Sequence, residues 1–486
     1  MSDQQMFIGG EWTDAADGQS MDVINPATGL SHTSVPKGGT QDAERAINTA
    51  YDTFYSKDWA KVTNRDRGRI LIKAGEYIRE HLEEIAKLES MDMGKIYSDS
   101  LSDVEEAAFI FEYYGGYATK IQGEIPPMSD GGMALIVKEP AGVCVAITPW
   151  NYPIVMASQK VAPAIAAGCT SILKPASDSP SSSLWLAKAL EYAGLPKGVL
   201  SVLTGPGSSI GATLVKSPKV DVVSLTGSTE VGKWIMKEAA DTLKRVTLEL
   251  GGKSPNIFYA DADFQAAVEG ACNGVFWNSG EICSAGTRVF VEQSIYDDAV
   301  NAMVDIAENR VVGDPLDTET EMGPVVSAKQ KETIDHYIEI GKKETRLAGE
   351  GKTPEDEKFA GGYWVAPTIF ADATNDMVIS REEIFGPVMT VIPFKEVDEV
   401  IDMANDNPYG LAAAVWTRDI KKGLNTAKAL RAGNVWINDT QPAPSEGMWG
   451  GYKQSGFGRE LGPWGLDDYL EAKQIYINLD EGGDEE

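Results

Sequence analysis

Hydrophobic and polar residues follow two different periods along this chain, and the change between them marks the predicted elements. In three N-terminal stretches, residues 41–56, 65–90 and 99–119, apolar positions recur at helical spacing with charges between them. After residue 140, short apolar runs rich in Val, Ile and Leu are each followed by a helical stretch. Runs of this kind are typical of buried parallel strands. The chain therefore predicts N-terminal helices followed by alternating strands and helices.

Four strand-then-helix repeats carry this alternation. Their strand runs are AGVCVAITPW, TSILKPAS, VLSVLTG and VDVVSLTG, and the first two helices are expected over 153–167 and 180–193. Such repeats build a doubly wound parallel sheet. A second set after residue 250, made of PNIFYA, TRVFVE, LAAAVWT and GNVWIND, predicts a second α/β domain. The stretch 120–140 has paired prolines and paired glycines, and it breaks the pattern as an excursion or hairpin would.

Composition narrows the class of protein. The 486 residues are 43% hydrophobic, which favours two or three domains over one. Lys and Arg number 43 against 73 Asp and Glu, so the net charge of −30 argues against a nucleic-acid partner. No apolar run approaches the roughly 20 residues of a membrane helix. The start, MSDQQMFIGGEW, lacks the basic and apolar segments of a secretory signal.

Cysteine and histidine usage indicates a reducing compartment and no metal site. The four cysteines are Cys144, Cys169, Cys272 and Cys283. They show no CxxC spacing, so neither a zinc site nor a disulfide framework is expected, and free thiols fit the cytoplasm. The three histidines are His32, His81 and His336. Each has polar neighbours and is interpreted as a surface residue, so acid–base chemistry is expected from carboxylates, lysine or water.

Cys283 is the first candidate for chemistry. It lies in FWNSGEICSAGTRVFV, a loop of small and polar residues just before the strand-like run Thr287–Val291. Structural cysteines are usually buried among apolar neighbours and inert. Here Gly280 and Gly286 let the backbone approach a ligand closely. The loop by itself leaves open both a catalytic and a structural thiol.

Three further stretches each allow a functional and a plain structural interpretation. In SLTGSTEVGKW, Gly227 and Gly232 mark a strand–turn–helix that could bind phosphate at the helix N-terminus. In LELGGKSPNIF, Glu249 is either a general base of raised pKa or a glutamate at a strand end. In TPWNYP, Asn151 is either a donor to an oxyanion or a turn asparagine.

Together these stretches resemble the aldehyde dehydrogenase superfamily, in the same order along the chain. They are TPWNYP, LKPAS, LTGSTEVG, LELGGKSPNIF, SGEICSAGTR, REEIFGPV and GGYKQSGFGRELG. Glu249 and Cys283 lie 34 residues apart, as the family pattern requires, and the resemblance runs from FIGGEW at residue 7 to YLEAKQIYIN near residue 478. It implies the α/β aldehyde dehydrogenase fold, with a Rossmann-like cofactor domain, an α/β catalytic domain and a small β oligomerisation arm.

The resemblance also implies domain boundaries and an assembly. The cofactor-binding domain is expected over 1–117 and 141–250, and the catalytic domain over 251–445. The oligomerisation arm and C-terminal segment are expected over 118–140 and 446–486. Proteins of this family form homodimers or homotetramers in which the arm pairs with the sheet of a neighbour, so the same is expected here.

By the same resemblance, the chain is an NAD(P)-dependent, non-acylating aldehyde dehydrogenase. The Cys283 thiolate attacks the aldehyde carbon, and the oxyanion lies between the Asn151 amide and the Cys283 backbone N–H. Hydride transfer to nicotinamide leaves a thioester, which water activated by Glu249 hydrolyses to the acid. The presence of Glu249 favours hydrolysis over transfer to coenzyme A. Lys160 and Glu460 are implied as a proton exit path.

For the cofactor, the resemblance assigns eight residues: Trp150, Lys174, Ser177, Gly227, Ser228, Gly232, Glu383 and Phe385. Lys174 matches the lysine that binds the adenosine ribose, and Glu383 matches the carboxylate that binds the nicotinamide ribose. Strictly NAD-dependent members tend to have Glu three residues after the lysine. Ser177 stands there instead, so either NAD or NADP is expected, with the preference open.

For the substrate, the sequence looks most like betaine aldehyde dehydrogenases and their amino-aldehyde relatives. Those enzymes hold a quaternary ammonium in an aromatic cage by cation–π attraction. Tyr152 and Trp449 match two cage positions, Gln159 replaces the usual third Trp, and Ile282 is expected beside them in the substrate pocket. An aliphatic, semialdehyde or aromatic substrate stays an alternative. A catalytically silent protein on the same fold is the alternative from another class, and loss of Cys283 or Glu249 would have favoured it.

Overall fold

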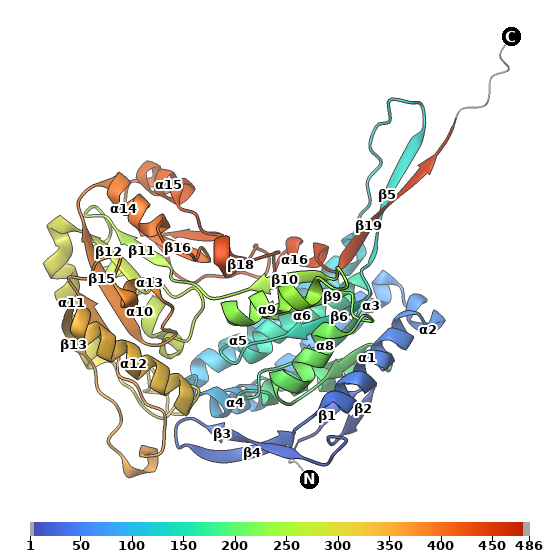
Figure 1. The fold of residues 1–486 in the computed structure, drawn as a ribbon, viewed down its shortest axis with the longest axis horizontal. Helices are drawn as coiled ribbons and strands as arrows, with labels where there is room; N and C mark the ends of the chain where they lie inside the picture. The colour runs from blue at the N-terminus through green and yellow to red at the C-terminus, as the bar shows by residue number, and fades with distance from the viewer. Residues whose placement is uncertain (1–3, 480–486) are drawn as a thin grey trace.

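The computed structural model describes residues 4–479 and arranges them as two large sheets with helices against their faces, a projecting two-stranded arm and a separate two-stranded sheet (Figure 1). The first sheet has eight strands, in the order β18-β10-β9-β6-β7-β8-β1-β2. In that order they are Gly456–Phe457, Arg245–Glu249, Val222–Thr226, Val143–Ile147, Thr170–Lys174, Leu200–Val202, Met6–Ile8 and Glu11–Thr13. The five strands from β10 to β8 are mutually parallel, which confirms the predicted doubly wound core.

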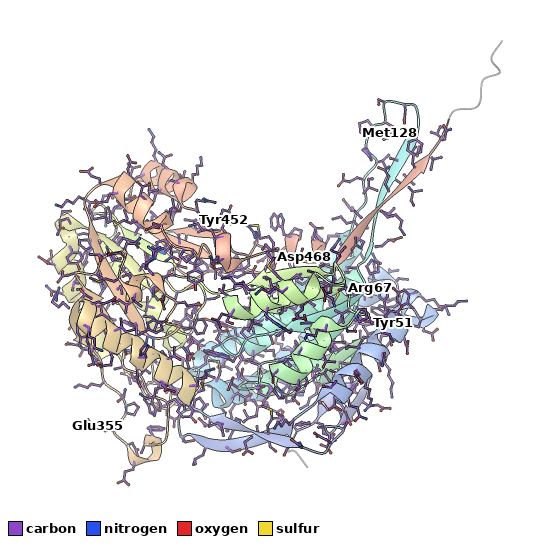
Figure 2. The ribbon with its side chains drawn as sticks, in the orientation of Figure 1. Tyr51, Arg67, Met128, Glu355, Tyr452 and Asp468 are labelled. Atoms are coloured by element: carbon purple, nitrogen blue, oxygen red, sulfur yellow. The ribbon has the colours of Figure 1, made fainter. Side chains whose placement is uncertain are left out.

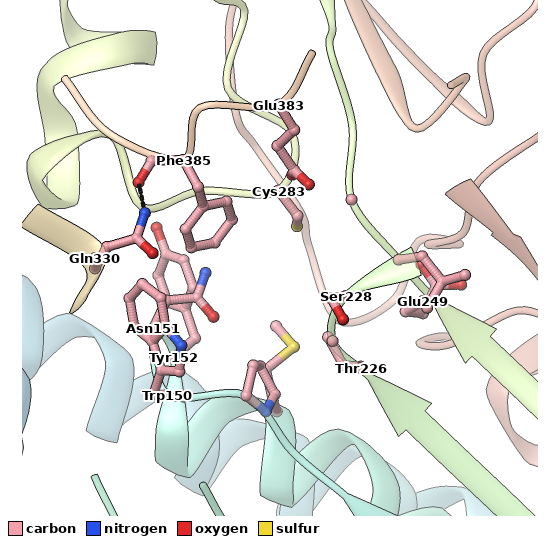
Figure 3. Close-up of a pocket in the computed structure, with 15 residues that line it drawn as sticks. Trp150, Asn151, Tyr152, Thr226, Ser228, Glu249, Cys283, Gln330, Glu383 and Phe385 are labelled. Atoms are coloured by element: carbon pink, nitrogen blue, oxygen red, sulfur yellow. Dashed lines mark hydrogen bonds between the residues drawn. The ribbon is translucent and has the colours of Figure 1, made fainter. Parts of the chain in front are cut away.

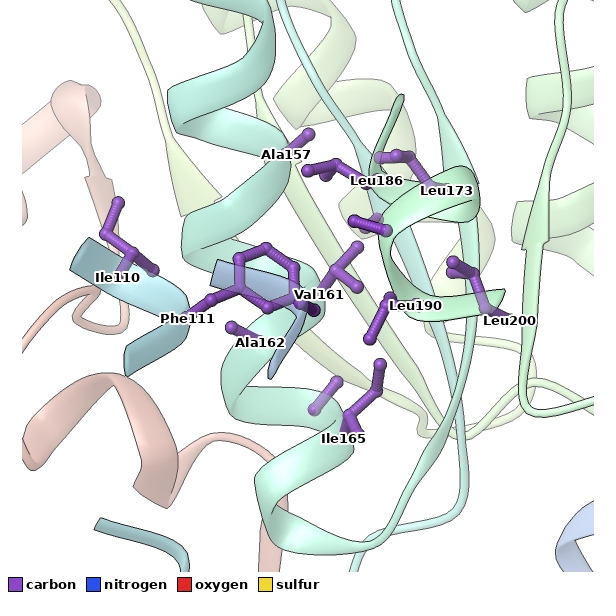
Figure 4. Packing of buried hydrophobic residues seen from close by; sticks show 14 of the residues in the cluster. Ile110, Phe111, Ala157, Val161, Ala162, Ile165, Leu173, Leu186, Leu190 and Leu200 are labelled. Atoms are coloured by element: carbon purple, nitrogen blue, oxygen red, sulfur yellow. The ribbon is translucent and has the colours of Figure 1, made fainter. Parts of the chain in front are cut away.

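Helices cover both faces of this sheet because its parallel strands are apolar on both sides. One face carries α3 (Asn64–Glu80), α4 (Leu82–Met93), α5 (Tyr97–Tyr117), α6 (Pro153–Ala167) and α7 (Ser181–Ala193). The other face carries α1 (Thr40–Phe54), α8 (Ala212–Lys216) and α9 (Thr229–Ala239), and the short α2 (Lys57–Ala60) follows α1. In Figure 4, Val161 and Ile165 of α6 pack in the same apolar cluster as Phe111 of α5 and Leu173 of β7.

The second sheet has seven strands, in the order β13-β14-β15-β12-β11-β16-β17. In that order they are Arg346–Glu350, Thr368–Ala371, Val388–Phe394, Arg288–Glu292, Pro255–Phe258, Ala412–Trp416 and Asn434–Ile437. All neighbours are parallel except β13 with β14. The helices of this part are α10 (Phe264–Phe276), α11 (Tyr296–Asn309), α12 (Ala328–Glu344), α13 (Val378–Arg381), α14 (Val397–Asn405) and α15 (Ile420–Ala429). The predicted second α/β unit is therefore present.

The arm is a two-stranded antiparallel ribbon of β5 (Met133–Pro140) and β19 (Leu470–Ile477), which projects away from the body (Figure 1). Met128 lies at its tip (Figure 2). A small β arm is therefore present as predicted, while its role in oligomerisation stays a prediction. Ahead of β19, α16 (Trp464–Asp467) follows β18 on the edge of the first sheet, so part of the predicted segment 446–486 contacts the body, and residues 480–486 lie outside the described range. The exact domain boundaries stay a prediction.

The surface interpretation of the histidines is wrong for His32. It lies on β4 (Leu30–Pro36), which pairs with β3 (Ser20–Asn25), and its Nε2 is 3.0 Å from Asp92 Oδ1 of α4. The side chain of His32 is 8% exposed and that of Asp92 is fully buried, because α4 covers the strand. The polar neighbours of His32 along the chain gave no indication of its contact with Asp92, which lies in a distant segment. Within residues 4–479, no helix is both long and apolar enough to cross a membrane.

Several chemistry-bearing residues lie at the carboxyl ends of the parallel strands of the first sheet. Glu249 ends β10 beside Thr226 at the end of β9, and Lys174 ends β7 beside Ile147 of β6. Ligands of open α/β sheets bind outside these strand ends. The register of the sheet therefore gathers the predicted residues at one edge.

Candidate active site

A cavity of about 240 Å³ opens at this edge, and residues from both halves of the chain line it (Figure 3). Nine of the residues expected from sequence are among its lining: Trp150, Asn151, Tyr152, Gly227, Ser228, Glu249, Cys283, Glu383 and Phe385. The other lining residues, which the sequence did not single out, are Pro149, Met156, Thr226, Leu250, Gly251 and Gln330. The expected nucleophile, oxyanion donor and base therefore meet around one space.

The Cys283 loop is held in place by close backbone contacts. Asn278, Ser279 and Gly280 have φ values of 47°, 54° and 73°, in the left-handed region that side chains rarely adopt. A Cβ on Gly280 would lie 2.2 Å from the carbonyl of Gly386, and one on Gly252 would lie 2.4 Å from the Cys283 oxygen. Glycine at 252 thus lets the segment between β10 and β11 approach the Cys283 backbone closely.

Asn151 is oriented by the same loop. Its Nδ2 donates to the Glu281 carbonyl at 2.7 Å, and Asn278 Nδ2 donates in turn to the Asn151 carbonyl at 3.2 Å. A side-chain amide has two N–H groups, so one stays available to an oxyanion beside Cys283. The positioning role of Asn278 was missed from sequence, because only its left-handed backbone and this long-range contact reveal it.

Glu249 is buried, and its carboxylate has no hydrogen-bond partner within the described residues. Burial raises its pKa well above the usual range, and the nearby Glu460 carboxyl raises it further. Glu460 forms an ion pair with Lys160, both buried, and Lys160 Nζ also donates to Ser224 Oγ at 3.0 Å. The Lys160–Glu460 pair is therefore close enough to Glu249 to influence its pKa, although neither residue lines the cavity.

The residues expected at the adenosine end of a cofactor lie outside the cavity lining. Lys174 is buried, and among the described residues no hydrogen bond to its ammonium is present. Burial lowers its pKa to about 8, and the Asp178 carboxylate opposes that shift. Ser177 Oγ donates to the Gly205 carbonyl at 3.0 Å, so its one proton is already engaged.

The turn into α9 combines binding and packing roles. Ser228 caps the helix by accepting from Val231 N at 3.3 Å, which leaves the N–H groups of the first turn directed at the strand ends. A Cβ on Gly232 would lie 2.7 Å from Leu250 Cδ2. Gly232 therefore serves the packing of α9 on the sheet, and it does not reach the cavity.

Glu383 and Phe385 reach the cavity from the second sheet. Glu383 Oε1 accepts from Gly252 N at 3.0 Å, and burial raises the pKa of this carboxyl to about 7. Phe385 has a φ of 57°, and its ring meets Trp150 edge-on at 5.2 Å. Gln330 Nε2 donates to the Phe385 carbonyl at 2.7 Å (Figure 3), which holds this unusual backbone in place.

Of the four residues expected in the substrate pocket, only Tyr152 lines the cavity. The other three, Gln159, Ile282 and Trp449, are buried and are not among its lining residues. Trp449 belongs to a small apolar cluster that packs against Cys283, and its ring lies 6.4 Å from that of Trp436. Trp436 was missed as a neighbour, although VWIND was among the stretches that suggested the substrate.

A family model described as the aldehyde dehydrogenase family matches residues 12–475 of this chain. The chain belongs to this family. The predicted family, fold and enzyme class are thereby confirmed.

Individual aldehyde dehydrogenases match over nearly their whole length. The betaine aldehyde dehydrogenase of Bacillus subtilis is 45% identical over 98% of this chain and 97% of its own. The human retinaldehyde dehydrogenase 3 is 42% identical over 98% and 93%. Among solved structures, an NAD⁺ complex of a Bacillus cereus aldehyde dehydrogenase has a TM-score of 0.95 at 45% identity, covering 98% and 96%. A Staphylococcus aureus betaine aldehyde dehydrogenase with NAD⁺ has a TM-score of 0.96 at 41% identity, covering 100% and 97%.

The resting state of this aldehyde dehydrogenase has a protonated thiol. Burial raises the pKa of Cys283 to about 12, and the negative charges of Glu383 and Glu249 add to that shift. Because the thiolate is the reactive form, alkylation by iodoacetamide is expected to rise about tenfold per pH unit between pH 7 and 10.

This alkylation is followed by mass spectrometry with Cys283→Ala as the control, since the other three cysteines are buried. A plateau in rate below pH 9 would contradict the high pKa of the thiol in the cofactor-free protein.

Proposed function

We propose that this aldehyde dehydrogenase oxidises an aldehyde to its carboxylic acid with NAD or NADP, through a thiohemiacetal and a thioester on Cys283. The observation that carries the proposal is that Cys283, Asn151 and Glu249 line one cavity. They are a nucleophile, an oxyanion donor and a base, as this chemistry needs. Reduction of NAD or NADP by a panel of aldehydes tests it, and silence toward the whole panel would contradict it.

The first half-reaction rests on Cys283 and Asn151. The Cys283 thiolate adds to the aldehyde carbon, and the charge moves to the carbonyl oxygen. The free N–H of Asn151 and the Cys283 backbone N–H would donate to that oxygen, and one such donor is typically worth about 2.7–4 kcal/mol. A bound nicotinamide ring would supply the hydride acceptor that turns this adduct into a thioester.

The second half-reaction rests on Glu249. A buried carboxylate without partners, of raised pKa, is a strong base for a water molecule that attacks the thioester. The acid product then leaves Cys283 free. Lys160 and Glu460, which lie behind Glu249, are proposed to carry the proton away.

The residues that would hold the cofactor offer groups with no partner of their own. Thr226 Oγ1 lines the cavity and is buried without a hydrogen bond among the described residues. Lys174 lies outside the cavity lining, and within residues 4–479 its buried ammonium makes no hydrogen bond. Together with the first-turn N–H groups of α9, they fit ribose hydroxyls and a pyrophosphate. Glu383 and Phe385 would hold the nicotinamide end.

Ser177→Glu is expected to shift cofactor choice toward NAD. Wild type is expected to accept both cofactors, because Ser177 is small and neutral and Lys174 is cationic. A glutamate would repel the 2′-phosphate, so kcat/KM for NADP should fall at least about tenfold while that for NAD changes less. Both values are measured on both proteins. A thousandfold preference of wild type for NAD, or NADP use unchanged by the glutamate, would contradict the role of Ser177.

Betaine aldehyde or an amino aldehyde is the proposed substrate class, and an aliphatic, semialdehyde or aromatic aldehyde is the second candidate. Support comes from Tyr152 and Trp449 near Cys283 and from the two relatives named betaine aldehyde dehydrogenase. Overall sequence identity does not distinguish between these substrate classes. This chain is 42% identical to the retinaldehyde dehydrogenase and 45% identical to the betaine aldehyde dehydrogenase.

The arm supports a homodimer or homotetramer. Its two strands leave Ile475 and Tyr476 44% and 45% exposed, and an isolated two-stranded ribbon is marginal in water. Light scattering after gel filtration should give two or four times the chain mass of 52.4 kDa. A cytoplasmic location is part of the same proposal, supported by the four free thiols.

A further inference from the structure

Glu281 carries a buried carboxyl two residues before the nucleophile. The residue is fully buried, and its Oε1 accepts a hydrogen bond from Val326 N at 3.0 Å. Its Oε2 has no hydrogen-bond partner within residues 4–479. Removing a carboxyl from water is costly, and the hydrogen bond that offsets part of this cost joins the Cys283 loop to residue 326.

The segment that contains Val326 is held in place by contacts of its own. The Gly323 carbonyl accepts from Ser279 Oγ at 2.9 Å, so a second hydrogen bond joins the loop to the same segment. A Cβ on Gly323 would overlap the Gly94 oxygen, because the segment packs closely on the end of α4. The side chain of Glu281 is therefore fixed to backbone that has little freedom to move.

The backbone of the same residue holds the oxyanion donor. The Glu281 carbonyl accepts from Asn151 Nδ2 at 2.7 Å and from Asn278 Nδ2 at 3.4 Å. A carbonyl oxygen moves with its own residue, so a shift of Glu281 would turn the Asn151 amide away from its place beside Cys283. Hydrogen bonds to a developing oxyanion depend on short distance and good alignment, so even a small displacement weakens the donor.

The carboxyl of Glu281 is a neutral acid in the resting protein. Burial raises its pKa well above the usual range, the charge of Asp178 adds to that shift, and the charge of Lys95 opposes it. A neutral acid accepts from Val326 N through one oxygen, as a glutamine amide would. Glutamine is therefore the conservative replacement at position 281, and methionine removes the acceptor at similar length.

We infer that Glu281 is a positioning residue for the oxyanion site: its side chain, fixed to Val326 N, determines where its own carbonyl holds the Asn151 amide. Glu281 does not line the cavity, so it acts on the reaction through Asn151. This inference rests on the proposed aldehyde oxidation, and it deepens that proposal by naming a residue that sets the geometry of the first half-reaction.

A double-mutant cycle with Asn151→Ala tests this coupling. In the wild-type background, Glu281→Met should lower kcat/KM at least about tenfold, because a misplaced amide loses part of the hundredfold to thousandfold that one oxyanion donor typically supplies. In the Asn151→Ala background the donor is already absent, so the same change should cost less than about threefold. The aldehyde is propanal or betaine aldehyde, whichever wild type oxidises faster, and the cofactor is saturating.

Two further variants separate positioning from stability. Glu281→Gln keeps the acceptor for Val326 N, so its kcat/KM should stay within about threefold of the wild-type value. The matched control is Glu344→Met at the end of α12, where the Glu344 carboxylate accepts from Val378 N and Ile379 N at 3.1 and 3.3 Å. Glu344 does not line the cavity, so this loss of backbone contacts should lower the melting temperature and leave kcat/KM at the wild-type value.

Glu281→Asp takes the place of Glu281→Met in the cycle if the methionine variant does not fold. It keeps a carboxyl, but its side chain is one methylene shorter, so it reaches Val326 N only by moving the loop. Its loss of kcat/KM should likewise disappear in the Asn151→Ala background.

Three results would each overturn the inference while aldehyde oxidation stands. They are equal losses in the two backgrounds, full activity of the variant that lacks the contact, and a Glu281→Gln as impaired as Glu281→Met. Full activity of Asn151→Ala would remove the oxyanion donor and this inference with it. Failure of wild type to reduce NAD or NADP with any aldehyde of the panel would overturn the proposed function as well.

Discussion

Cys283→Ala is expected to abolish aldehyde oxidation while cofactor binding survives. Cys283 lies between Asn151 and Glu249 on one cavity, and no other cysteine lines that cavity. Losing a covalent step should cost several kcal/mol of transition-state stabilisation, so kcat/KM is expected to fall at least about a hundredfold. The expected Lys174 and Glu383 contacts to the cofactor do not involve the thiol. Steady-state NAD(P)H formation and cofactor titration by protein fluorescence measure the two quantities.

Cys272→Ala is the matched control for the loss of a thiol. Cys272 is buried in α10 among apolar residues, so its replacement should leave kcat unchanged apart from any loss of thermal stability. Residual turnover of Cys283→Ala above about a hundredth of wild type would contradict the nucleophile assignment.

Glu249→Gln is expected to separate the two half-reactions. The amide cannot take a proton from water, so acylation of Cys283 should continue while deacylation falls by about a hundredfold or more. Rapid mixing with aldehyde and cofactor should therefore show a burst of about one NAD(P)H per active site and then a stall. The steady-state rate and the burst amplitude are measured in one experiment.

The fold should tolerate this change. The carboxylate of Glu249 has no hydrogen-bond partner among the described residues, so no contact is lost. Its pKa is raised in the folded protein, so the ionised form destabilises the fold at any pH above its unfolded pKa, and a neutral amide removes that cost. The melting temperature at pH 8 should be unchanged or higher. A missing burst, with Cys283 still open to alkylation but reacting more slowly than in wild type, would mean that Glu249 acts earlier, in activating the thiol.

Glu249→Gln also tests the high pKa of the resting Cys283 thiol. Glu249 and Glu383 both raise it, so Glu249→Gln should lower the pKa of Cys283 slightly and speed its alkylation at fixed pH. Glu249 then has two opposing effects in this enzyme. It makes the free thiol less reactive, and it makes the bound thioester short-lived.

The sequence by itself determined the order of elements and the identity of the central residues. Runs of Val, Ile and Leu such as 143–147 and 222–226 predict buried strands because only such residues suit a sheet covered on both faces. Cys283 and Glu249 were assigned roles through the resemblance to aldehyde dehydrogenases, because their own stretches of sequence left a structural role open. The helical stretch 65–90 was expected from periodicity, but its division into two helices at His81 depends on a local backbone turn.

Tertiary structure decided everything that depends on contacts between distant segments. Four contacts join residues whose local sequence does not indicate the partner. They are Gln330 with Phe385, Asn278 with Asn151, Lys95 with the ring of Tyr152, and His32 with Asp92. The pKa values of Cys283 and Glu249 likewise follow from burial and from the charges of Glu383 and Glu460, which other parts of the chain bring near. Burial and the distances between charged groups depend on three-dimensional packing. A sequence pattern can therefore identify these groups, but it cannot determine their protonation states or their contacts.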